Sequence, residues 1–190
     1  MKKKSREKVA VITVGGCGMN SLEALTKSSD LNVKFIAVNR DKDSLNHCMI
    51  KHKVHLDADK NSAECVVMAV RCNESKIGKK LSNINKAIIV AGMGGFTGSY
   101  ASPEIAKIAE DMGCSIWSIV IEPFEFEGTQ RAQNAREGIT LLEKNSNAVL
   151  RISNQRLIKE VPSKTSMKKA FRVMDGEVVS LVKKIVRENI

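Results

Sequence analysis

Two glycine-rich segments of this sequence have residue types and spacing that could bind a phosphate. Residues 15–20 (Gly-Gly-Cys-Gly-Met-Asn) follow an apolar run at 9–14, and residues 91–99 (Ala-Gly-Met-Gly-Gly-Phe-Thr-Gly-Ser) follow a second apolar run at 87–90. A glycine-rich turn between a buried strand and a helix lets backbone N–H groups surround a phosphate at the positive end of the helix dipole. Two such turns in one sheet predict a single nucleotide held from both sides.

Neither turn matches a common phosphate-binding motif. No Gly-Lys-Ser/Thr follows the second turn, and neither turn has the three spaced glycines of the dinucleotide fingerprint. The alternative is that these glycines only form tight connections from strand to helix. One turn alone does not separate the two interpretations, whereas the repetition favours nucleotide binding.

The elements that must position these turns follow from hydrophobic periodicity. Apolar runs of strand type occur at residues 9–14, 33–38, 87–90, 116–121 and 148–152, with helical patterns between most of them. This alternation is typical of a doubly wound α/β domain, in which a mostly parallel sheet carries helices on both faces. Between residues 56 and 81 the pattern is weaker and predicts an acidic, irregular connection followed by one helix around residues 65–72.

The longest periodic segment lies at the end of the chain. An apolar stripe from Met167 to Ile190 follows Pro162 and the capping candidates Ser163 and Thr165, which predicts one long C-terminal helix from about residue 165 to 190. Such a stripe normally packs on the domain's own core. Because basic residues flank it, the helix would also suit an anionic membrane surface.

Charge and composition restrict the partners. The formal net charge is +10, and the excess collects in a basic flexible tail at residues 1–8 and in the last segment. Such patches attract polyanions, or they simply form solvated faces. Aromatic residues make up only 4%, so a stacking platform for nucleic acid is not expected. No apolar stretch reaches the roughly 20 residues of a membrane span and no secretory signal is recognisable, which predicts a cytoplasmic protein.

The five cysteines show no paired metal-ligand spacing. Their odd number fits reduced thiols in a cytosol, so no disulfide is expected. His47, His52 and His55 lie near Cys48 and Asp57, but scattered polar residues in a surface connection explain this group at least as well. We therefore expect no metal site built from protein ligands.

Taken in order, the motifs resemble the nucleotide-binding half of FtsZ, the bacterial member of the tubulin superfamily. The similarity runs from Val9 to about Leu181 and rests on residues 15–20, 91–98, 123–128 (Pro-Phe-Glu-Phe-Glu-Gly), Arg131, Asn154, 170–171 and Asp175. The resemblance implies one Rossmann-like tubulin/FtsZ GTPase domain over residues 9–190. It also implies GTP or GDP as ligand, with Mg²⁺ as an accompanying ion, and a role in cell division.

The resemblance assigns a role to each site residue. The two turns would hold the phosphates through Gly16, Cys17, Gly18, Met19, Asn20, Gly94, Gly95, Phe96, Thr97 and Gly98. Glu127 and Arg131 would hold ribose and phosphate, because a carboxylate accepts from sugar hydroxyls and a guanidinium offers paired donors. The alternative for Arg131 is an exposed helix charge. Asp175 would select guanine by accepting both N–H groups of its edge, Asn154 would add a base-edge contact, and Phe171 would stack on the base or belong to the core.

Several positions depart from the family pattern. Phe96 and Tyr100 replace glycines of the signature loop, and Cys17 and Met19 replace glycines of the first turn. A phenylalanine where the backbone should approach phosphate closely predicts a displaced loop or a looser pocket. We expect nucleotide binding to be weakened rather than lost, because backbone N–H groups survive any substitution except proline.

Hydrolysis is the activity that the resemblance supports least. In FtsZ and tubulin, an acidic loop after the central helix positions water against the nucleotide of the next subunit. Residue 190 still lies inside the corresponding helix, so we expect that loop and the C-terminal activation domain to be absent and hydrolysis to be very slow or lost. The expected function is that of a regulatory or membrane-associated FtsZ-like protein, with a homodimer or another FtsZ-like chain as partner. The alternative is an FtsZ-like scaffold for membrane remodelling or protein interaction that binds no nucleotide.

Overall fold

The protein folds around one six-stranded, entirely parallel sheet in the order β3-β2-β1-β4-β5-β6. The structure is a computed structural model that describes residues 8–28, 31–156 and 166–187. The strands are β1 (Val9–Val14), β2 (Lys34–Asn39), β3 (His52–His55), β4 (Lys86–Gly92), β5 (Ser115–Glu122) and β6 (Ala148–Ser153). The predicted doubly wound α/β fold is confirmed. The predicted basic tail falls almost wholly outside the described residues.

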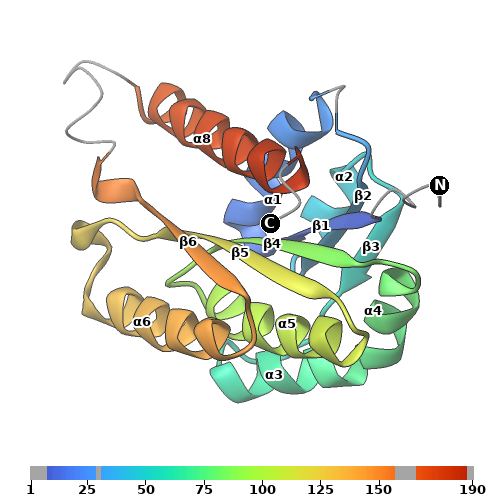
Figure 1. Cartoon of the computed structure of the whole chain (residues 1–190). Helices are drawn as coiled ribbons and strands as arrows, with labels where there is room; N and C mark the ends of the chain where they lie inside the picture. Colours follow the sequence, from blue (N-terminus) through green and yellow to red (C-terminus); the bar gives the residue numbers. More distant parts are fainter. Residues whose placement is uncertain (1–7, 29–30, 157–165, 188–190) are drawn as a thin grey trace.

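Helices cover both faces of the sheet, as Figure 1 shows. They are α1 (Gly15–Thr26), α2 (Lys42–His47), α3 (Ala63–Cys72), α4 (Glu74–Leu81), α5 (Ser102–Asp111), α6 (Thr129–Lys144) and α8 (Met167–Arg187). In that view α8 and α1 lie above the sheet, while α3, α5 and α6 lie below it. The long C-terminal helix is confirmed over the described part of the range predicted for it.

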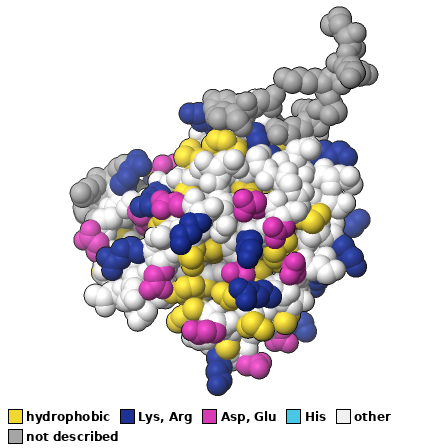
Figure 2. Space-filling view, turned by 60° about the horizontal axis from the view of Figure 1, so that its bottom comes forward, with side chains coloured by type: hydrophobic (Ala, Val, Ile, Leu, Met, Phe, Trp, Pro, Cys, Tyr) yellow, Lys and Arg dark blue, Asp and Glu magenta, His cyan; other side chains and the backbone are white. Residues whose placement is uncertain are grey.

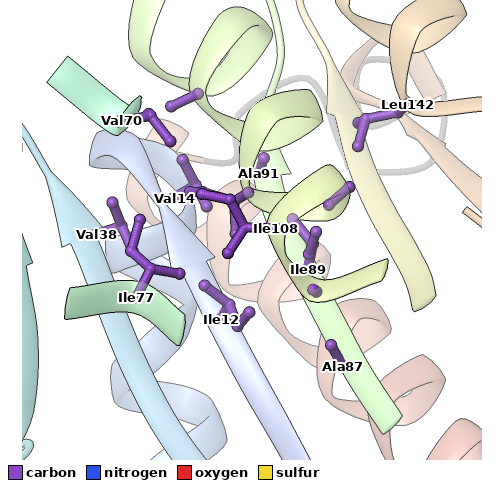
Figure 3. Close-up of a cluster of buried hydrophobic side chains, with 14 of the residues drawn as sticks. Ile12, Val14, Val38, Val70, Ile77, Ala87, Ile89, Ala91, Ile108 and Leu142 are labelled. Carbon is purple, nitrogen blue, oxygen red and sulfur yellow. The ribbon is translucent and has the colours of Figure 1, made fainter. Parts of the chain in front are cut away.

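Side chains of the central strands point alternately to the two faces of the sheet and pack into two separate hydrophobic cores. Ile12 and Val14 point into the cluster that lies between the sheet and helices α3, α4, α5 and α6. Part of this cluster is drawn in Figure 3. Val9 and Val11, one residue out of phase, pack with α8 through Val178 and its neighbours. This period of two is the pleat of a strand that is buried on both faces.

Three local features differ from the sequence-based prediction. A short edge strand, β3, was not predicted, because its sequence His-Lys-Val-His offers a single buried apolar side chain, Val54. Two helices, α3 and α4, occupy the region where one was expected. The helix α1 starts directly at Gly15 at the end of β1, so residues 15–20, expected as a turn, are helical.

The strand order places a ligand crevice at a defined position. Neighbouring strands β1 and β4 are connected to helices on opposite faces of the sheet, so the chain reverses its winding direction between them. In open α/β sheets, ligands bind outside the carboxyl ends of the strands at this switch point. Both glycine-rich turns begin there.

Two hydrogen bonds hold the helix α8, one near its middle and one near its end. The hydroxyl of Ser21 donates to Asp175 Oδ1 at 2.8 Å, and the buried Lys86 Nζ donates to the carbonyl of Ile185, in the last turn, at 3.4 Å. The last carbonyls of a helix lack intrahelical partners, so a lysine there is stabilising. These contacts set the height of α8 above the sheet.

The opposite face, formed by α3, α5 and α6, comes forward in Figure 2. Lysine, arginine and carboxylate side chains are interspersed there with apolar ones, so this face shows no field of one sign. Exposed apolar side chains of this layer include Met68, Met112 and Leu141. Met112 directly follows the last residue of α5 and is 45% exposed.

Candidate nucleotide site

A cavity of about 550 Å³ opens at the carboxyl ends of β1, β4 and β5. It is lined by all the predicted site residues except Gly18 and Met19, namely Gly16, Cys17, Asn20, Gly94, Gly95, Phe96, Thr97, Gly98, Glu127, Arg131, Asn154, Phe171 and Asp175. Predicted residues from five separate parts of the chain therefore meet around one space. Its volume is within the range of small-molecule sites.

The two glycine turns lie against each other and both line the cavity. A Cβ atom added to Gly15 would lie 3.4 Å from the Gly98 nitrogen and 3.5 Å from Thr97 Cβ. The first turn is the N-terminus of α1, and the second leads into a short π-helix, Thr97–Ala101, that continues as α5. Two helical N-termini with free backbone N–H groups thus approach the same space, which favours an anion there.

Gly18 and Met19, unlike the other predicted site residues, lie outside the cavity lining. A Cβ atom at Gly18 would lie 2.5 Å from the Val90 carbonyl oxygen, so this glycine permits close packing of α1 on β4. Met19 packs instead beside Leu22 and Leu45, on the α2 side of α1. Because residues 15–20 are helical, successive residues face different directions, and these two face away from the cavity.

The Cys17 side chain packs against the backbone of Gly92. A Cβ atom on that glycine would meet Cys17 Sγ at 2.7 Å, so the pair fits only because residue 92 has no side chain. Burial, together with the nearby carboxylates of Asp175 and Glu127, raises the pKa of Cys17 to about 12, and Arg131 opposes this only in part. The thiol is therefore protonated and uncharged at neutral pH.

This raised pKa predicts that Cys17 is inert toward alkylation. At about pH 8, iodoacetamide should modify the exposed Cys72 and leave Cys17 unmodified, because the thiolate is the reactive form. Peptide mass spectrometry at several reaction times measures both sites in one sample. Equal rates at the two cysteines would contradict the assignment.

Glu127 and Arg131 form an ion pair at the rim. Arg131 Nε lies 2.8 Å from Glu127 Oε2, and Glu127 Oε1 accepts from the Phe124 backbone nitrogen at 2.8 Å. Among the described residues the guanidinium pairs through Nε, which leaves its terminal NH₂ groups as donors for a ligand. The carboxylate thus fixes the direction of the guanidinium, whose side chain is 49% exposed.

The end of the cavity under α8 carries a carboxylate and an amide. Asp175 accepts the bond from Ser21, and its pKa is raised by burial, with a smaller contribution from Glu23, although the Ser21 bond acts in the opposite direction. Asn154 is 7% exposed, and its Oδ1 is buried with no hydrogen-bond partner among the described residues. A buried acceptor of this kind normally has a partner, so the amide is suited to a ligand donor.

The aromatic residues leave the cavity open. Phe96 stacks on Tyr100 with ring centroids 6.0 Å apart. It also packs against the core cluster between the sheet and helices α3, α5 and α6. The substitution of glycine by Phe96 is thus accommodated beside the loop. Phe171 is 36% exposed, and its ring meets that of Phe124 edge-on, with ring centroids 6.2 Å apart. It lines the cavity wall and is not part of the core.

Sequence reasoning missed several lining residues, among them Asn61, Gln130 and Asn134. Asn134 lies one helical turn after Arg131, so helical spacing could have identified it. Asn61 could not be found in this way, because it is brought to the cavity by a hydrogen bond from Arg40 Nη1 at 2.7 Å. That arginine lies 21 residues earlier, just after β2.

Within the described ranges, no three histidine, cysteine or carboxylate side chains are grouped in a way that could hold a metal ion. His47 Nδ1 lies 2.8 Å from the Asp43 carbonyl oxygen and His55 Nε2 lies 3.0 Å from that of Arg40. These rings are engaged with backbone carbonyls. Of the helices that the structure describes, none is both long and apolar enough to cross a membrane.

A family model described as "Tubulin/FtsZ family, GTPase domain" matches residues 8–162. The chain belongs to this family. The cell division protein FtsZ of Mycoplasmopsis pulmonis is 38% identical over 183 residues, covering 93% of this chain and 47% of that protein. The corresponding values are 32%, 88% and 38% for FtsZ of Rickettsia felis, and 32%, 95% and 50% for FtsZ 1 of Pyrococcus horikoshii. The chain spans half or less of the length of these relatives.

Two solved structures share the fold of this chain. The empty FtsZ dimer of M. jannaschii superposes with a TM-score of 0.87 at 26% identity, covering 97% of this chain and 55% of that one. CetZ1 of Haloferax volcanii, a GDP-bound monomer, gives 0.78 at 18% identity, covering 91% and 58%. The second similarity demonstrates the fold alone. Family and fold therefore agree with the resemblance inferred from the motifs.

Proposed function

We propose that the cavity binds guanine nucleotide, GTP or GDP, and that the protein is an FtsZ-like nucleotide-binding protein. One observation carries the proposal: a single cavity joins two helical N-termini at one end to a half-buried carboxylate and an unpartnered amide oxygen at the other. The first end suits phosphates and the second suits the N–H groups of guanine. Membership of the GTPase-domain family supports the same ligand.

Each side chain then has a distinct role in binding. Asp175 accepts from the guanine edge, and Asn154 Oδ1 accepts a further base donor. Glu127 accepts from the ribose hydroxyls, and Arg131 donates to a phosphate. Mg²⁺ would be held mainly by the phosphates, since this ion usually keeps several waters and few protein ligands.

We further propose that the 190-residue chain alone hydrolyses GTP very slowly or not at all. Among the residues that the structure describes, the carboxylates that line the cavity are those of Glu127 and Asp175. Glu127 is engaged with Arg131 and a backbone nitrogen, while Asp175 lies at the end assigned to the base. Neither is placed to activate water at a phosphate, so a regulatory role that depends on binding is favoured.

Calorimetric titration with GTP, GDP and ATP tests the function directly. We expect binding of both guanine nucleotides and at least tenfold weaker binding of ATP, because adenine has no matched donor pair for Asp175. Phosphate release should stay near the background rate. Absence of binding with any guanine nucleotide would instead support the alternative, an FtsZ-like scaffold that acts through its surfaces.

Arg131→Ala should weaken GDP binding by about 1–3 kcal/mol, because a charged donor to a phosphate is lost. Arg136→Ala is the matched control, since this exposed arginine lies on the same helix but does not line the cavity. Titration of both variants with GDP measures the difference. A loss of equal size in the control would show that the effect is not specific to the site.

We also propose a cytoplasmic protein that associates peripherally with anionic membrane. The supporting observation is a row of exposed basic residues on α8, Lys169, Arg172, Lys184 and Arg187, at helical spacing. Sedimentation with anionic liposomes should show binding that is lost at about 0.5 M salt. The double variant Arg172→Ala/Lys184→Ala should bind less, whereas Lys107→Ala/Lys144→Ala, on other exposed surfaces, should bind like the wild type.

Self-association is the remaining part of the proposal. The supporting observation is that the M. jannaschii structure, which shares the fold of this chain with a TM-score of 0.87, is described as an FtsZ dimer. We expect a weak homodimer or association with another FtsZ-like chain. Sedimentation equilibrium with and without GDP measures it, and a strictly monomeric protein at high concentration would refute it.

A further inference from the structure

The loop between β4 and the π-helix is held by side chains at one residue, Gly94. This residue has a φ of +99°, a conformation that favours glycine. Its backbone nitrogen donates to Ser99 Oγ at 2.8 Å, and its carbonyl oxygen accepts from Asn134 Nδ2 at 3.1 Å. Both bonds are buried, and the two side chains are 0% and 3% exposed.

The amide of Asn134 is itself oriented by its neighbours. A backbone carbonyl can only accept, so the NH₂ group must face Gly94. The amide oxygen then accepts from Gln130 Nε2 at 3.0 Å. The Tyr100 hydroxyl lies 3.3 Å from the same oxygen and donates its proton to the nearer, charged Glu137 Oε2 at 2.7 Å. The side chain therefore has one favourable orientation.

Tyr100 belongs to the same network although it replaces a family glycine. Burial and the bond to Glu137 raise its pKa to about 12, so the hydroxyl keeps its proton at neutral pH. Its ring stacks on Phe96, the other large residue of this loop. Both departures from the glycine pattern are thus tied to α6 on one side of the loop, and Asn134 completes this attachment at Gly94.

We propose that Asn134 is a positioning residue that, together with Ser99, holds Gly94 and thereby aims the backbone N–H groups of residues 95–98 into the cavity. The inference rests on the proposed nucleotide function for its role in binding. The physical reason is that a loop held at both polar groups of one residue cannot rotate those peptides without leaving a buried group unpaired. Asn134 acts through the loop and is not assigned a contact with the ligand.

The test compares Asn134→Leu and Ser99→Ala with Gln133→Ala. The control residue lies on the exposed side of α6 and bonds to Glu137 at 2.9 Å. Each test variant should bind GDP about tenfold more weakly, whereas affinity for guanosine, which lacks phosphates, should be unchanged. The double variant should lose little more than either single one, because both bonds hold the same residue.

A second measurement needs no nucleotide. Amide hydrogen exchange of Gly94, whose N–H donates to Ser99 Oγ, should be about tenfold faster in both test variants of the unliganded protein and unchanged in the control. If the wild type binds no guanine nucleotide, the proposed function fails. The exchange measurement still tests whether Asn134 and Ser99 hold Gly94 in place. Unchanged exchange, or equal losses of GDP and guanosine affinity, would overturn the inference. Ser99→Ala, the smaller change, serves if Asn134→Leu does not fold.

Discussion

Gly98→Ala should lower the free energy of unfolding by about 3 kcal/mol and abolish nucleotide binding, the largest effect expected of any single methyl group here. A Cβ atom at residue 98 would overlap the carbonyl oxygen of Gly92. That oxygen belongs to β4, which is held by β1 on one side and β5 on the other, so it cannot retreat. The loop must move instead, and the N–H groups of the second turn then leave the cavity.

The matched control for this substitution is Gly95→Ala. A Cβ atom there would meet nothing within 4 Å, and the residue has no positive φ, so stability and binding should change little. Urea unfolding followed by fluorescence of Trp117, the single tryptophan, measures stability, and GDP titration measures binding. If the Gly98→Ala variant unfolds at the same urea concentration as the wild type, the backbones of Gly92 and Gly98 do not approach each other as closely as described.

Asp175→Asn should weaken GDP binding by about 2 kcal/mol and remove most of the preference for guanine over adenine nucleotides. The carboxylate accepts two N–H groups, whereas an amide at the same place presents one of its own donors to them. Glu177→Gln is the control, because this residue lies on the same helix outside the cavity lining. Competition between GDP and ADP compares the two variants, and a retained guanine preference in Asp175→Asn would refute the role of the carboxylate.

The raised pKa of Asp175 gives this prediction a pH dependence. Ionised carboxylate is the form that binds guanine, so GDP affinity should rise with pH through the raised folded-state pKa and then level off. The free energy of unfolding of the unliganded protein should change with pH in the opposite direction. Between the ordinary value of 3.8 and the folded-state pKa, the folded form holds more protons than the unfolded form, so rising pH lowers the free energy of unfolding. Both trends should vanish in Asp175→Asn.

The central strands and the long helix were predictable because their burial is written into local patterns. Strands β1, β4 and β5 are buried on both faces and read as continuous apolar runs, and α8 reads as a broad apolar stripe. The edge strand β3 was not predictable, since its pairing with β2 supplies a stability that its own four residues do not signal.

The sequence by itself determined the order of the central strands and of the long helix, the two glycine turns and the family, because each rests on local patterns or on motifs that can be read in order along the chain. Only the tertiary structure decided which side chains share the cavity. The packing of α1 on β4 turns Gly18 and Met19 away, and a hydrogen bond from Arg40 brings Asn61 in. Likewise, Asn134 reaches Gly94 across 40 positions of sequence. Contacts of that range arise from how helices pack on the sheet, and no local pattern of residues encodes them.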